Sequence, residues 1–131
     1  MTPEAAAYIE KARMCLAHAR MMLDIKELGS EAGRNAYLAA FHAAQAFILV
    51  HTGKAAKTHS GVRSEFARLA KADTRIDSQF PAFLAQAYLL KEVADYELGP
   101  GSIVPRDRVE AAIQTATRFV DCIEAVLLQE K

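Results

Sequence analysis

The chain has 131 residues, of which 52% are hydrophobic and 24% charged, and its formal net charge is zero. This hydrophobic fraction excludes disorder, and the balanced charge excludes a protein that attracts nucleic acid over its whole surface. A chain of this length fits one domain with one core, so we expect residues 1–131 to form a single domain in which any anion site is a local basic cluster.

The first predicted helix begins with Thr2 as its N-cap and Pro3 at its first position, and it ends near Gly29. Apolar residues recur along it at steps of three and four, which is the spacing of a helix with one buried face. These residues are Ile9, Ala12, Leu16, Ala19 and Leu23.

The second predicted helix begins with Ser30 as its N-cap and ends at Gly53. It has no wide polar face, because apolar residues such as Tyr37, Leu38 and Phe41 point in every direction around it. A helix of this kind must be surrounded by other helices. We expect its own bundle to cover part of it and a second copy of the chain to cover the excess, so the sequence predicts a homodimer.

Three more helices follow a short basic connection between Gly53 and Gly61. The third is short, the fourth runs from Phe80 or Pro81 to Leu98, and the fifth begins near Pro105. The apolar positions of these helices are Val62, Phe66, Leu69 and Ala70 in the third, Phe83, Ala87, Leu90 and Ala94 in the fourth, and Val109, Ile113, Ala116, Val120, Ile123 and Leu127 in the fifth. The sequence 99–102, Gly-Pro-Gly-Ser, predicts an irregular loop between the last two. Helices joined by short connections pack antiparallel, so the fold class is all-α, an up-and-down bundle of four or five helices.

Nothing in the sequence indicates export or a membrane. The first residues, Met1-Thr2-Pro3-Glu4, lack the basic and apolar stretches of a signal peptide, and the longest apolar stretch is too short to span a bilayer. Cys15 and Cys122 stand far apart and form no metal-spaced pair. We therefore expect a cytoplasmic protein. We also expect no cofactor or metal, because no phosphate-binding loop, HExxH or paired CxxC is present.

Three blocks of residues resemble the HEPN superfamily. The first is residues 33–46, with the sequence GRNAYLAAFHAAQA, and the second is residues 57–62, KTHSGV, followed by Phe66. The third is residues 94–96, ADY, placed before a loop and a long final helix. The order and spacing of these blocks are similar to the family over about residues 5–128.

The resemblance implies a bundle that is commonly dimeric and often encoded or fused with a minimal nucleotidyltransferase, as a toxin–antitoxin pair or as its nucleotide-binding partner. Active members are metal-independent ribonucleases with an Arg, four to six residues, and then a His on a later helix. Here Lys91 stands at the place of the Arg and Tyr96 at the place of the His. Tyr has a pKa near 10 and is a poor base at neutral pH, so this pair is suited to bind an anion and not to cleave RNA.

A literal Arg-x4-His occurs only in the first helix, at Arg13 and His18. Their side chains are about 140° apart around the helix, and we interpret them as part of a solvated face.

His42 is the first candidate for acid–base chemistry. We interpret it in two ways: as a hydrogen-bonded residue of the core, or as part of a cleft with Asp95 and Tyr96 of the fourth helix. Arg34 and Gln45 lie on one stripe of the second helix and would add polar groups to that cleft or to a dimer interface.

The basic connection is the first candidate for an anion site. Lys54, Lys57 and His59 precede the free amides that open the third helix, and such amides suit phosphate. The simpler interpretation is that Thr58 or Ser60 caps the helix and the lysines are loop charge. With Lys91 and Arg34, these residues complete the predicted phosphate-binding set.

Three hypotheses follow for the function. The first is a non-catalytic HEPN module that binds a minimal nucleotidyltransferase, a nucleotide or RNA. The second is a ribonuclease toxin in which His42 or His59 replaces the missing base. The third is a purely structural interaction module.

Overall fold

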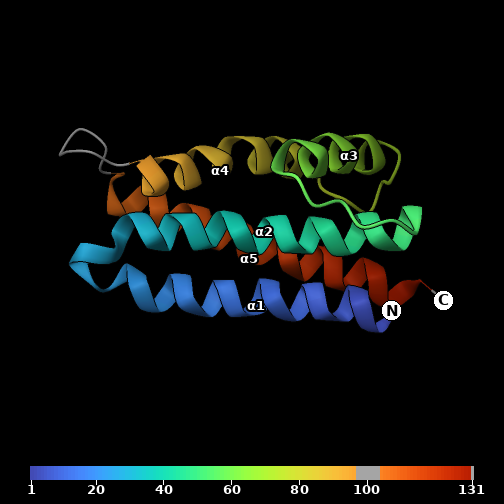
Figure 1. Ribbon diagram of the computed structural model, residues 1–131, viewed down its shortest axis with the longest axis horizontal. Helices are drawn as coiled ribbons and strands as arrows, with labels where there is room; N and C mark the ends of the chain where they lie inside the picture. Colours follow the sequence, from blue (N-terminus) through green and yellow to red (C-terminus); the bar gives the residue numbers. More distant parts are fainter. Residues whose placement is uncertain (97–103, 131) are drawn as a thin grey trace.

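The structure is a computed structural model that describes residues 1–96 and 104–130. Within these residues it is an all-α bundle (Figure 1). The elements are α1 (Pro3–Leu23), a short 3-10 helix η1 (Lys26–Leu28), α2 (Gly29–Thr52), α3 (His59–Lys71), α4 (Gln79–Tyr96) and α5 (Arg106–Gln129). The predicted loop at 99–102 and the predicted end of the fourth helix at Leu98 lie outside the described residues.

The first helix begins as predicted but ends earlier. The Thr2 side chain accepts a hydrogen bond from the Ala5 amide at 3.2 Å, and Pro3 takes the first helical position. The prediction that this helix continues to Gly29 is wrong, because α1 stops at Leu23 and η1 follows it.

The second helix differs from its prediction at the start and agrees with it at the end. The prediction of Ser30 as N-cap is wrong: η1 leads directly into α2, whose cap residue is Leu28 without a side-chain hydrogen bond. At the other end Gly53 has φ +74°, a left-handed conformation that favours glycine and ends the helix as predicted.

α2 is the core of the molecule. It contacts α1, α3, α4 and α5, and Figure 1 shows it lying between α1 on one side and α3 and α4 on the other. From residue 32 to residue 48 every residue is buried except Arg34, Leu38 and His42, which are partly exposed and share one stripe. The chain's own helices therefore cover the apolar surface for which we expected a second copy, and the prediction of a homodimer loses that argument.

The apolar positions of the last helix are confirmed and those of the fourth only in part. All six predicted positions of α5 are buried. In α4 the buried residues are Phe80, Leu84 and Ala87, whereas Phe83 and Leu90 are only partly buried. α4 carries apolar side chains on more than one face, so its periodicity alone does not identify the buried face.

No helix in the described part of the chain combines the length and the apolar character needed to cross a membrane. Residues 1–96 and 104–130 also hold no group of three His, Cys, Asp or Glu side chains placed to bind a metal ion.

Candidate functional site

A polar cluster lies where α2, α3 and α4 meet, and it begins at the first residue of α3. The 53–58 connection doubles back along α2, so that His59 lies beside the middle of that helix. The Tyr37 hydroxyl is 2.7 Å from His59 Nδ1, and the His59 ring packs 4.5 Å from the Phe41 ring between their centroids. The Thr58 side chain accepts from the Gly61 amide at 3.0 Å and fixes this end of α3, so the interpretation of Thr58 as a cap is confirmed.

The protonation of this pair follows from its burial. Burial raises the pKa of Tyr37 to about 12, an effect that hydrogen bonding from Arg63 and its charge oppose, so the phenol keeps its proton at neutral pH. Burial is also the main cause that lowers the pKa of His59, followed by the charges of Lys91 and Arg63. The neutral imidazole therefore accepts a hydrogen bond from the Tyr37 hydroxyl at Nδ1 and carries its own N–H at Nε2.

Tyr88 of α4 forms the other side of the cluster. The Arg63 guanidinium carbon lies 4.2 Å from the centre of the Tyr88 ring, and Lys91 Nζ lies 5.8 Å from it. Both distances suit a cation–π interaction. Arg63 Nη1 is buried and has no hydrogen-bond partner within the described chain. A buried unpaired donor of this kind costs about 1–3 kcal/mol.

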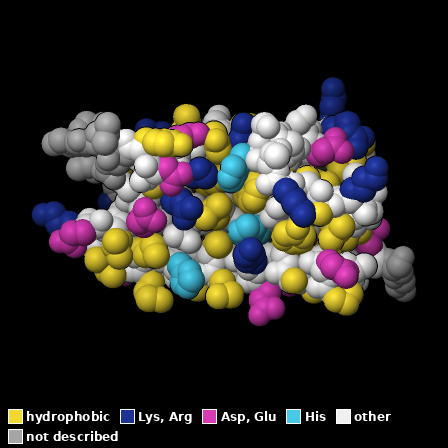
Figure 2. Space-filling view, in the orientation of Figure 1, with side chains coloured by type: hydrophobic (Ala, Val, Ile, Leu, Met, Phe, Trp, Pro, Cys, Tyr) yellow, Lys and Arg dark blue, Asp and Glu magenta, His cyan; other side chains and the backbone are white. Residues whose placement is uncertain are grey.

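An ion-pair bridge joins α2 to α4 next to this ring. Asp95 accepts from Arg34 Nε at 3.1 Å and from Lys91 Nζ at 2.5 Å. The hydrogen bond from Lys91 is the main cause that holds the Asp95 pKa below its usual value, and the charge of Arg34 adds to it. Figure 2 shows acidic, basic and histidine side chains side by side over the boundary between α2 and α4.

The structure does not form the predicted cleft of His42, Asp95 and Tyr96. His42 Nδ1 lies 2.8 Å from Gln45 Oε1 on its own helix, and the Lys11 charge on α1 helps burial to lower its pKa. Asp95 pairs instead with Arg34, which precedes His42 by eight positions and therefore lies about 12 Å from it along the axis of α2. Tyr96 is 71% exposed. His42 is therefore hydrogen-bonded on its own helix, as our simpler interpretation had it, but it is partly exposed and not a residue of the core.

The predicted phosphate-binding set is also divided. Lys54 and Lys57 are exposed on the 53–58 connection, whereas His59 points inward to Tyr37. The charged groups that act on His59 are Lys91, Arg63, Asp95 and Glu92, and neither connection lysine is among them.

Gln45 has a different task from the one we expected. It is buried, and its side-chain amide donates to the Ala56 carbonyl at 2.9 Å while its oxygen meets His42. It therefore holds the 53–58 connection against α2 and adds nothing to a cleft with Arg34.

The two Arg/His-like pairs of the sequence are both accounted for by other contacts. Lys91 pairs with Asp95, and Tyr96 projects about 140° away from it around α4. Arg13 is not merely solvated, as we had interpreted it, because it pairs with Asp121 and Glu124 of α5.

Sequence reasoning missed Arg63 and Tyr88. A signal for both was present: Arg63 stands four residues after His59, and Tyr88 stands three before Lys91, so each shares a helix face with a residue that we had selected.

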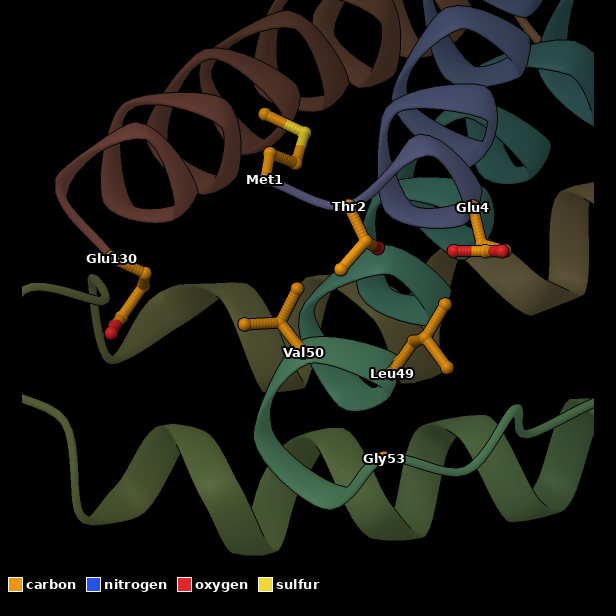
Figure 3. A pocket seen from close by; sticks show the side chains of 7 residues that line it. All are labelled: Met1, Thr2, Glu4, Leu49, Val50, Gly53 and Glu130. Atoms are coloured by element: carbon orange, nitrogen blue, oxygen red, sulfur yellow. The ribbon is translucent and has the colours of Figure 1, made fainter.

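A separate hollow of about 670 Å³ lies at the far end of α2 (Figure 3). The figure shows Leu49 and Val50 of α2 facing Thr2 at the start of α1. Its charged lining residues in the described chain are Glu4 and Glu130, so an anion is unsuited to it.

The bundle and its interhelical polar cluster define the class of protein: an all-α domain with a mixed-charge site between three helices. The chain belongs to the HEPN domain family, whose model matches residues 5–126. No curated protein matches the sequence.

Proposed function

We propose that the chain is a HEPN module without ribonuclease activity that works as the partner of a minimal nucleotidyltransferase and associates with phosphate groups of a nucleotide or RNA. The observation that carries this proposal is the state of α4. Its Lys91 is paired with Asp95, and Tyr96 projects into solvent.

The chemistry of RNA cleavage supports the non-catalytic part. Cleavage without a metal requires a base active near neutral pH and a fixed cation beside the same phosphate. On α4 the Tyr96 phenol is a poor base, and its side chain points away from that of Lys91. A module with this arrangement holds charged partners and leaves the chemistry to the enzyme it accompanies.

Co-expression with a tagged nucleotidyltransferase from the same operon tests the partnership. We expect a stable complex on size-exclusion chromatography, and the isolated chain should leave RNA intact in EDTA. Light scattering on the same samples reports whether the chain forms the homodimer that we predict. A chain that never co-purifies with the enzyme and binds neither nucleotide nor RNA contradicts the proposal and favours a purely structural module.

A second function, a ribonuclease toxin with a rearranged site, is favoured by one observation. His59 has a lowered pKa and lies beside Arg63 and Lys91, which is a neutral imidazole next to two cations. This function requires RNA cleavage that persists in EDTA and disappears in His59→Gln. Retained cleavage in His59→Gln, or none in the wild type, excludes it.

A further inference from the structure

Arg63 differs from the other cations of the cluster in having no carboxylate partner. Arg34 and Lys91 share Asp95, while Arg63 forms no ion pair within the described residues and leaves Nη1 unpaired. A buried polar donor normally has a hydrogen-bond partner, and a buried charge is normally paired. Arg63 is therefore the cation of the cluster that has a donor left for a further anion.

The surroundings of Arg63 supply more than one donor. Three cationic or donor groups lie against the Tyr88 ring: the Arg63 guanidinium at 4.2 Å, the His59 ring at 5.5 Å and Lys91 Nζ at 5.8 Å from its centre. They come from two helices, α3 and α4, so the site exists only in the folded bundle.

The cluster around Tyr88 has more positive than negative charges. Arg34, Lys91 and Arg63 are positive, and Asp95 and Glu92 are negative. Asp95 is occupied by two cations, and Glu92 lies against the Tyr88 hydroxyl. The remaining positive charge is that of Arg63.

We propose that Arg63, His59 and Lys91 form a binding site for a single phosphate group over the Tyr88 ring, with Arg63 as its principal ligand. This rests on the proposed function, because it names the groups that meet the phosphate. A guanidinium fork suits two acceptor oxygens, and the additional imidazole N–H and ammonium favour a tetrahedral group with more oxygens than a carboxylate has. Arg63 and His59 are each only partly buried, so both side chains reach the surface, where a small anion can approach them.

The test compares two Arg→Gln variants on the same helix. Arg63→Gln removes the proposed ligand, whereas Arg68→Gln removes an exposed arginine that is paired with Glu65, so both change the net charge equally. Each protein is titrated with inorganic phosphate, AMP and a short single-stranded RNA. The Arg63 Nε–H and His59 ring signals are followed by NMR.

We expect these signals to shift in the wild type with saturation, and we expect Arg63→Gln to weaken binding about tenfold or more while Arg68→Gln binds as the wild type does. Equal affinity for phosphate and AMP identifies the phosphate group alone as the ligand, and a tighter RNA complex identifies RNA as its source. The wild-type signals give a result even where Arg63→Gln fails to fold.

Three outcomes overturn the proposal: wild-type signals that do not move with any probe, undiminished binding by Arg63→Gln, or an equal loss in Arg68→Gln. Capture of the nucleotidyltransferase is a separate measurement. If the nucleotidyltransferase is captured and no probe binds in the titrations, the phosphate site is contradicted and the proposed partnership is not.

Discussion

The Tyr37 hydroxyl lies 2.7 Å from His59 Nδ1, across 22 positions of sequence. This hydrogen bond joins the most buried part of α2 to the first residue of α3. It holds the start of α3 beside the middle of α2, and Arg63, one helical turn further along α3, lies against Tyr88 of α4.

Tyr37→Phe should destabilise the protein by about 1–2 kcal/mol, because it leaves His59 Nδ1 without a partner at a position that water reaches poorly. The free energy of unfolding, from urea titration followed by circular dichroism, measures this. Tyr96→Phe is the matched control, since Tyr96 is 71% exposed and should change little. Equal stability of both variants contradicts the role given to the Tyr37 hydroxyl.

Stability should decrease as the pH falls below about 6.5, because the fold holds His42 and His59 neutral. Burial is the main cause that lowers both pKa values from 6.5. The unfolded chain therefore binds protons first, and the free energy of unfolding falls until the pH passes below the folded-state pKa values. Asp95, whose pKa is lowered from 3.8, acts only at more acidic pH.

Urea titrations between about pH 8 and about pH 5 check this dependence. His42→Gln and His59→Gln should each flatten the slope, whereas His18→Gln, at an exposed position of α1, should leave it unchanged. The groups facing His59 are Tyr37, Arg63 and, from α4, Tyr88, Lys91, Glu92 and Asp95. A pH-independent stability contradicts the neutral state assigned to both histidines.

Gln45→Ala should destabilise the protein by about 1–3 kcal/mol, because the Ala56 carbonyl and His42, both partly buried, each lose a hydrogen-bond partner. Amide hydrogen exchange should also accelerate in residues 53–58, which this side chain holds against α2. Gln114→Ala, at an exposed position of α5, serves as the control. Unchanged exchange in the connection would show that other contacts hold it.

Substitution by alanine should have opposite effects on stability at Gly33, inside α2, and at Gly53, directly after it. A Cβ at Gly33 meets Leu90 Cβ at 3.5 Å, an ordinary contact, so Gly33→Ala should stabilise the helix by about 0.5–1 kcal/mol. Gly53 has φ +74°, where a Cβ is strained, so Gly53→Ala should destabilise by about 1 kcal/mol. Thermal unfolding of both variants checks the pair, and a loss of stability in Gly33→Ala would mean that α2 and α4 are packed more tightly than the structure has them.

Much of the fold was predictable from the sequence because it depends on local patterns. The apolar repeat of α5, the Thr2 cap and the glycine that ends α2 each follow from neighbours within one or two turns. The start of α2 could not be predicted in this way, because η1 replaces the expected Ser30 cap. The buried face of α4 could not be predicted either. The position of α2 decides which of the apolar faces of α4 is covered.

The site was predictable only within single helices. The Lys91 and Asp95 pair follows from their spacing of four on one helix. Tyr37 and His59 meet only because the 53–58 connection reverses along α2. That path depends on the Gln45 contact with Ala56, which no periodicity indicates.

The position of α2 at the centre has a consequence for synthesis. The helix leaves the ribosome after α1, while α5, which covers another of its sides, begins only at residue 106. Until then the nascent chain carries a partly covered apolar helix of 24 residues. We expect chaperone dependence during translation to end when α5 emerges, so that truncation before α5 yields aggregate in place of a smaller folded domain.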